Sequence, residues 1–151
     1  MSYTTQSGRE QILQDVAEAA EELGNALAAL SEAYEHLDDQ TAERMEDGLF
    51  RPLQGAFGQL KRTHEEFARR YDLRGRDFPP APVPLPGDAR RLFERASESI
   101  QSADDTLAAL QDSLLPVEVG DEALRAGLSS VRLLLAPLPL VSSQLVSRFG
   151  R

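Results

Sequence analysis

The sequence predicts an all-α protein built as a four-helix bundle, and three observations support this fold class. Four stretches of the chain place apolar residues alternately three and four positions apart, which gathers them on one face of an α-helix. The chain has 151 residues, enough for one domain with its own core. It has no cysteine, so no disulfide scaffold holds it together. Because four such faces leave water by packing on one another, we predict a single domain over residues 1–151.

The first helix is predicted to span about residues 8–37. Ser7 and Glu10 stand in the order of a capping box, in which each side chain hydrogen-bonds the backbone N–H of the other residue. The helix should therefore start at Ser7 and continue as long as the apolar spacing lasts. That spacing is kept by Leu13, Val16, Ala20, Leu23, Leu27, Leu30, Tyr34 and Leu37.

A tight turn is predicted near residues 38–40. The apolar spacing fails after Leu37, and Asp38 and Asp39 suit the N-terminus of a new helix, where the helix dipole favours carboxylates. An alternative places the turn at residues 47–48, which would lengthen the first helix and shorten the second. We prefer the earlier turn because it gives four helices of nearly equal length.

The second helix is predicted over about residues 41–72. Its stripe contains steps of four from Met45 to Phe57, a stutter that locally changes the winding of a helix. Pro52 lies within the stutter, and we expect a kink there because an interior proline removes a backbone hydrogen bond. His64 occupies a core position of this stripe and is predicted to be a buried neutral imidazole, hydrogen-bonded to one partner.

Residues 73–87 are predicted to form a linker in the polyproline II conformation, because five prolines fall within residues 79–86. Fifteen residues in this conformation reach roughly 45 Å, which is about the length of a thirty-residue helix. The linker is thus long enough to run back along the whole bundle, as in the one-crossover topology of ferritin-like bundles. The similarity to those bundles is one of architecture alone. A simple up-down-up-down order of helices is the alternative.

The third helix is predicted over about residues 88–115. Asp88 is expected to cap its N-terminus, and the helix must stop before Pro116. A turn is predicted at residues 117–120.

The fourth helix is predicted over about residues 121–149, with Asp121 as its N-cap. Pro137 and Pro139 interrupt it. Leu138 precedes a proline and is therefore pushed away from α geometry, so we expect a sharp kink or a short break at this point.

The charge distribution of the chain is uneven. The formal net charge is −9, which argues against nucleic-acid binding. Residues 1–50 carry a net charge of −10, whereas residues 51–100 carry +3. We expect the basic residues between Lys61 and Arg95 to face the acidic first helix.

Residues that carry enzyme chemistry are not arranged in any recognisable motif. The sequence has no phosphate-binding glycine loop, no nucleophile elbow and no cysteine nucleophile. The Glu-x-x-His pairs of a di-iron bundle are missing as well, since Lys61 stands three residues before His64 and Ala33 three residues before His36. We therefore predict no enzymatic activity, no cofactor and no metal site.

The fourth helix is unusually apolar on its outer side. Leu133, Pro137, Leu140 and Val146 fall outside the core stripe, and no charge lies between Leu133 and Ser147. A helix that is apolar all round needs a cover. These fifteen uncharged residues are too few to span a membrane, so we predict an interaction surface.

The sequence thus predicts a non-catalytic protein-interaction or scaffold module that forms a homodimer or binds another protein. With no signal-peptide pattern at the N-terminus, we expect it in the cytoplasm. The alternative is a bundle that senses or binds a small apolar ligand near the break at Pro137 and Pro139, with His64 as a polar contact.

Overall fold

A computed structural model describes residues 2–84 and 86–149, and all of the regular structure in these ranges is helical, which confirms the predicted all-α class. The helices are α1 (Ser2–Tyr34), α2 (Asp39–Met45), the π-helical segment η1 (Glu46–Phe50), α3 (Arg51–Arg70), α4 (Ala89–Asp112), α5 (Leu115–Glu118), α6 (Glu122–Leu135) and α7 (Leu138–Phe149).

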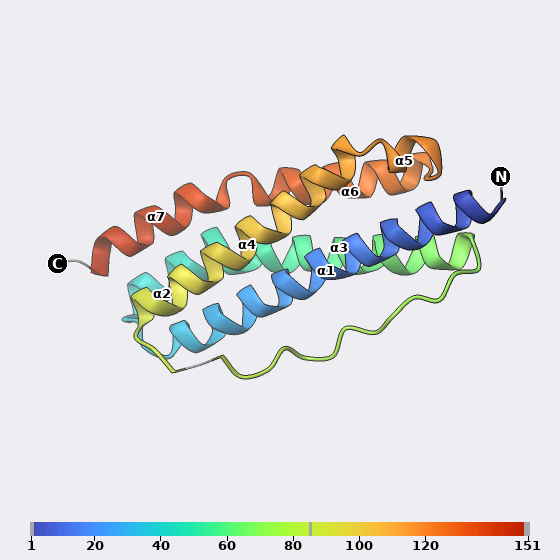
Figure 1. Ribbon diagram of the computed structural model, residues 1–151. Coiled ribbons are helices and arrows are strands. Elements are labelled where there is room, and N and C mark those ends of the chain that lie inside the picture. The colour runs from blue at the N-terminus through green and yellow to red at the C-terminus, as the bar shows by residue number, and fades with distance from the viewer. Residues whose placement is uncertain (1, 85, 150–151) are drawn as a thin grey trace.

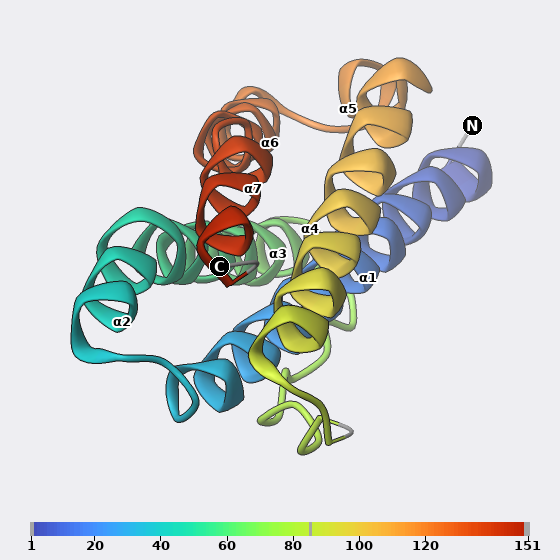
Figure 2. The same ribbon diagram turned by 90° about the vertical axis from the view of Figure 1, so that its left-hand side faces the viewer.

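The long helices run roughly along one axis (Figure 1). The segments α2, η1 and α3 follow one another as a single rod that runs back beside α1, and the linker then returns along the length of the molecule to the start of α4. The most extensive contact joins α1 and α4, and the next joins α3 and α6. The view along the axis shows α7 continuing α6 over the side away from α1 (Figure 2).

The helix α1 begins five residues before the predicted capping box, so Ser7 is an interior residue and not a cap. The first turns of α1 pack against the segment that follows α5. Arg9 Nε donates a hydrogen bond to the Val119 carbonyl at 2.9 Å, and a Cβ added to Gly8 would lie 3.0 Å from the Val119 side chain. This tertiary contact outweighs the local signal of the capping box.

The turn after α1 lies at residues 35–38, slightly before the predicted position. Asp38 caps α2 as the paired aspartates suggested, since its carboxylate accepts from the Thr41 N–H at 2.8 Å. Tyr34 is 44% exposed and so leaves the predicted stripe, whereas Ala33 beside it is fully buried. The alternative turn at residues 47–48 is wrong, because Gly48 lies within η1.

The predicted kink at Pro52 is replaced by the π-helical segment η1. Proline has no N–H to donate, and Pro52 stands in the first turn of α3, directly after η1. The wider π turn takes up the stutter of the sequence. As a result Met45, Leu49 and Leu53, each four residues apart, are all almost fully buried.

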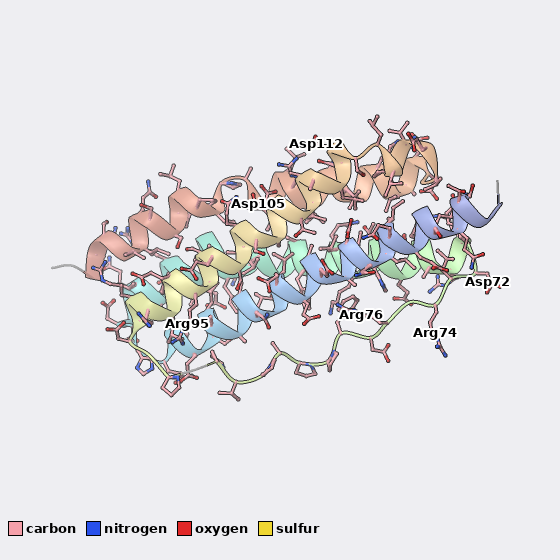
Figure 3. All side chains as sticks on the ribbon, in the orientation of Figure 1. Asp72, Arg74, Arg76, Arg95, Asp105 and Asp112 are labelled. Atoms are coloured by element: carbon pink, nitrogen blue, oxygen red, sulfur yellow. The ribbon has the colours of Figure 1, made fainter. Side chains whose placement is uncertain are left out.

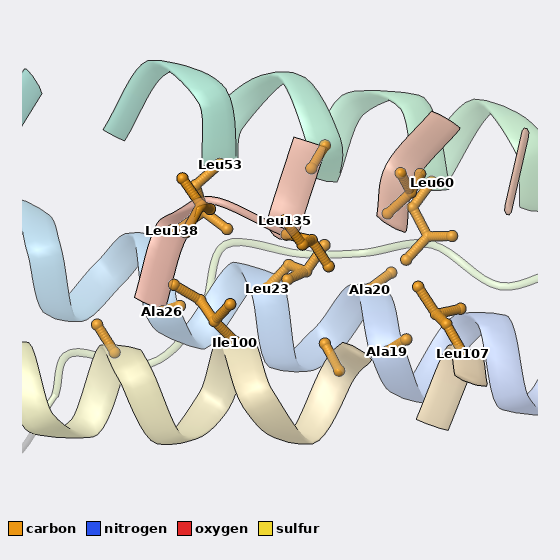
Figure 4. Close-up of a cluster of buried hydrophobic side chains, with 14 of the residues drawn as sticks. Ala19, Ala20, Leu23, Ala26, Leu53, Leu60, Ile100, Leu107, Leu135 and Leu138 are labelled. Atoms are coloured by element: carbon orange, nitrogen blue, oxygen red, sulfur yellow. The ribbon is translucent and has the colours of Figure 1, made fainter. Parts of the chain in front are cut away.

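The core between α1 and α4 is built from small residues of α1 and larger ones of α4. Ala19 and Ala26 are completely buried, and they lie near Ile100 and Leu107 of α4 (Figure 4). Because alanine side chains are short, the two helix backbones can approach closely. This close approach accounts for the extent of the α1–α4 contact.

The helix α4 ends at Asp112, three residues before the predicted end. Leu114 adopts a left-handed backbone conformation with φ of 68° and is 55% exposed, so it leaves the predicted stripe. Part of the predicted turn at residues 117–120 is instead the short helix α5, in which Pro116 occupies the first turn.

The predicted fourth helix is broken into α6 and α7, as its prolines suggested. The break falls at residues 136–137, and Leu138 is the first residue of α7 and is buried. Pro139 is tolerated because the first turn of a helix needs no N–H from it. Asp121 caps α6 by accepting from the Leu124 N–H at 2.8 Å. The side chain of Phe149 lies outside the described residues.

Candidate functional site

The outer side of α6 and α7 carries an uncharged strip that we call the α6–α7 ridge. Its members follow the spacing of four and three residues, and all are exposed: Ala126, Ser130, Leu133, Pro137, Leu140 and Gln144. Leu133 is 75% exposed and Leu140 is 66% exposed. The structure therefore brings Leu133, Pro137 and Leu140 of the predicted surface onto one face.

Val146 does not share this face. It is half-buried and packs against the core, because it stands one helical turn after the buried Ser142. Ser142 in turn shares a hydrogen bond of 2.7 Å with Ser97 of α4. Val146 and Pro139 instead help to line an open groove of about 380 Å³ between α4 and α7.

The orientation of the ridge is fixed by contacts on the opposite side of α6. Val131 and Leu135 are buried in the core. Arg132 Nε donates to Asp104 at 2.9 Å, and its Nη1 donates to Gln111 at 2.8 Å, so α6 is tied to α4. The bond to Asp104 raises the pKa of Arg132. With this side anchored, Leu133 must point outward.

The stretch Glu122–Arg148 is long and apolar enough to cross a membrane by length and composition, although a third of its most apolar window is buried in the molecule. The buried part is the inner face of α6 and α7, which contributes Leu128 and Leu145 to the core. Core helices of soluble proteins satisfy the same criterion. Arg132, bonded to α4, also lies near the middle of this stretch.

His64 lies on α3 under the linker and is only 3% exposed. The Phe78 ring of the linker meets the imidazole edge-on, with 5.1 Å between the ring centres. A Cβ added to Gly75 would lie 3.2 Å from His64 Cε1, so a glycine lets the linker approach this closely. Burial, together with the charge of Arg76, lowers the pKa of His64.

The sequence predicted a hydrogen-bond partner for His64, and the structure corrects this. No group of residues 2–84 or 86–149 forms a hydrogen bond with either imidazole nitrogen. The reason is that the linker covers the ring with Gly75 and with Phe78, whose side chain has no hydrogen-bonding group. His64 also lines a cavity different from the groove at Pro139, so the structure does not bring these two parts of the predicted ligand site together.

An open cavity of about 780 Å³ lies between α3 and linker residues 75–78, and we call it the His64 cleft. Two of its cations have acidic partners: Arg69 binds Glu65 at 2.9 Å, and Arg76 reaches from the linker to Glu21 of α1 at 2.8 Å (Figure 3). Its full charged lining is Lys61, Arg62, Arg69, Arg76, Glu65 and Asp77.

The other two cations of the cleft have no acidic partner within the described residues. Lys61 lies over the Phe57 ring, with 4.3 Å between Nζ and the ring centre, and Arg62 donates to Gln59 at 3.3 Å. The basic run thus only partly faces α1 as predicted. Arg70, for example, binds Asp121 of α6 through two hydrogen bonds.

The cleft could not be predicted from the sequence, because the path of the linker creates it. Lys61 and Arg62 were visible as part of a basic run, but nothing in their spacing indicates that Gly75 and Phe78 lie over His64. Among the described residues, no three histidine, aspartate or glutamate side chains gather where they could hold a metal ion.

Comparison with known proteins adds no relative: no family model, no curated protein and no solved structure shows a significant match to the chain.

Proposed function

We propose that the chain is a non-catalytic helical interaction module and that two copies pair through the α6–α7 ridge. The observation that carries this proposal is the exposure of Leu133 and Leu140, at 75% and 66%, on a face without charge. Soluble proteins rarely leave a continuous apolar patch uncovered.

The charge distribution favours the ridge as the place where two copies meet. The chain has a net charge of −9, so two copies repel each other over most of their surface. The stretch from Leu133 to Ser147 has no charged residue, so ridges that meet there bury no ion. A closed two-fold dimer is the commonest way to cover such a face, because the same residues serve both copies.

The exposed leucines set the expected strength of this dimer. Complete burial of a leucine contributes about 1.5–3 kcal/mol, so the exposed parts of Leu133 and Leu140 would contribute about 1–2 kcal/mol each. The four leucines of a two-fold pair then supply about 4–8 kcal/mol. Association itself costs at least about 4 kcal/mol, so the leucines alone leave at most about 4 kcal/mol, which corresponds to a Kd of about 1 mM. Any tighter pairing must come from the other residues of the ridge.

The test is a double substitution on the ridge, Leu133→Asp with Leu140→Asp, measured by light scattering over a range of concentrations. Wild type should become dimeric, and the variant should stay a folded monomer with unchanged helical circular dichroism. The matched control is Val83→Asp with Val117→Asp, since these residues are 87% and 63% exposed but lie off the ridge. This control should dimerise like wild type. A wild type that stays monomeric up to about 1 mM would refute the proposal.

We also propose that the helices form a four-helix bundle with one long crossover. The contacts of α1 with α4 and of α3 with α6 support this topology. So does the linker, which leaves α3 near the N-terminal end of α1 and reaches α4 at the opposite end of the molecule (Figure 1).

A further inference from the structure

We propose that the His64 cleft binds a small organic anion, a carboxylate or a phosphate monoester, whose charged group faces Lys61, Arg62 and His64. This site is independent of dimerisation, because the cleft lies on α3 and the linker and shares no residue with the α6–α7 ridge.

The first support is an imidazole without a partner. His64 is 3% exposed, yet no described residue hydrogen-bonds either of its nitrogens. Every buried side-chain nitrogen or oxygen of the described residues has a hydrogen-bond partner, so an imidazole nitrogen without one is reached by solvent. A ligand in the cleft can take the place of that water. The ring lines the His64 cleft, so a ligand there can reach it.

The second support is charge. Lys61 and Arg62 line the same cleft, and no carboxylate of the described residues pairs with either of them. Four cationic side chains and two acidic ones line the cavity, although the chain as a whole is strongly acidic. Hydrogen bonds from charged donors to carboxylates or phosphates are among the strongest in proteins.

The third support is the apolar wall, which favours an organic anion over an inorganic one. Phe78 and Ala68 line the cleft next to His64. An anion that carries a ring or a short chain can place its charge at Lys61 and Arg62 and its carbon skeleton against these residues. Asp77 also lines the cleft, and its carboxylate disfavours ligands that place a second negatively charged group beside it.

The two histidines of the chain provide a direct test by NMR, because His64 titrates inside the cleft while His36 is exposed on the segment after α1. The charged groups that line the cavities around His64 come from three segments: Lys61, Arg62, Glu65 and Arg69 of α3, Glu10 of α1, and Arg74, Arg76 and Asp77 of the linker. An anion bound beside the imidazole stabilises its protonated form. Saturating ligand should therefore raise the pKa of His64 by about one unit, and the ring signals of His36 should not respond to the ligand.

The probes are phenyl phosphate, benzoate and inorganic phosphate, each compared with sodium chloride at equal ionic strength. Phenyl phosphate or benzoate should bind more tightly than inorganic phosphate, and the stronger of the two identifies the anionic group. Equal effects of all salts on His64 and His36 would overturn the proposal, since they would reflect screening and not binding. Binding of inorganic phosphate alone would overturn the assignment of an organic ligand.

The variants separate the cleft from general charge effects. Lys61→Gln with Arg62→Gln should weaken binding about tenfold or more, because it removes both unpaired cations. The control, Arg90→Gln with Arg91→Gln, makes the same change in net charge on exposed residues of α4 and should bind like wild type. Equal weakening in both variants would refute the site. His64→Gln removes the imidazole that faces the ligand, so the ligand affinity of this variant, followed by calorimetry, should fall as well.

Discussion

The contact between α3 and α6 makes a sharp prediction about two glycines. Gly127 of α6 is buried, and a Cβ added there would lie 2.9 Å from Thr63 Cγ2 and still closer to Thr63 Oγ1. Thr63 cannot simply turn away, because its hydroxyl donates to the Gln59 carbonyl at 2.9 Å. Gly55 of α3 is exposed, and a Cβ added there meets nothing within 4 Å.

The same substitution should therefore have opposite effects at the two positions. Gly55→Ala should stabilise the protein by about 0.5–1 kcal/mol, the ordinary preference of a helix for alanine. Gly127→Ala gains the same preference but overpacks the helix contact, at a cost of about 1–3 kcal/mol. The two variants should thus differ by about 1–3 kcal/mol in free energy of unfolding.

Urea denaturation followed by circular dichroism measures this difference. With a slope of about 2 kcal/mol per M, the two midpoints should lie about 0.5–1.5 M apart, with wild type between them. Thr63→Ala, added to Gly127→Ala, should recover part of the loss, because it removes the two atoms nearest to the new methyl group. If Gly127→Ala stabilises the protein as much as Gly55→Ala does, the inference that α3 and α6 leave no room for a methyl group at position 127 is wrong.

Two further predictions concern α6 and the linker. Burial raises the pKa of Asp121, but hydrogen bonds from Arg70, the Leu124 N–H and Tyr71 outweigh it and lower the pKa below 3.8. The stabilising contribution of the Asp121 carboxylate is therefore complete well above pH 3.8 and is lost as the pH falls through the folded-state pKa. Asp121→Asn should lower the free energy of unfolding by about 1–2 kcal/mol at pH 7 and by progressively less in acid. The same difference between wild type and variant at pH 7 and at pH 2 would contradict this. The second prediction shortens the linker by deleting residues 79–84, which leaves twelve of the eighteen residues 71–88 between α3 and α4. Twelve residues reach about 43 Å at full extension. The rod over residues 39–70, along which the linker returns, is roughly 48 Å long. The shortened chain should lose cooperative thermal unfolding, and wild-type unfolding of this variant would rule out the proposed crossover.

Helical periodicity predicted the all-α class and the buried faces of the helices, because burial in the core requires apolar residues at helical spacing. The stripe through Leu128, Val131 and Leu135 had to face inward, which also determined that Leu133 and Leu140 face outward. Helix ends were less predictable. Ser7 has the residues of a capping box, yet the contact of Arg9 with Val119, 110 positions away in the chain, extends the helix past it. A local signal cannot report such a distant partner.

The His64 cleft shows a second limit of sequence reasoning. The register of α3 correctly placed His64 in a buried position. What covers the ring depends on the lateral path of a segment with no regular hydrogen bonds, and so no periodicity reveals it. The low exposure of His64 is as expected, and the aromatic ring against it belongs to Phe78 of the linker.

The pairing of α1 with α4 has a consequence for how the chain is made. The largest helix contact joins segments whose far ends, Tyr34 and Asp112, are 78 residues apart. At a synthesis rate of about 5–20 residues per second, a ribosome needs about 4–16 s to cover that distance. The alanine-rich side of α1 therefore lacks its partner until α4 has been made. The nascent chain is thus exposed to chaperones and to wrong partners for seconds, at the stage when its first two helices are complete and the last two are not yet made.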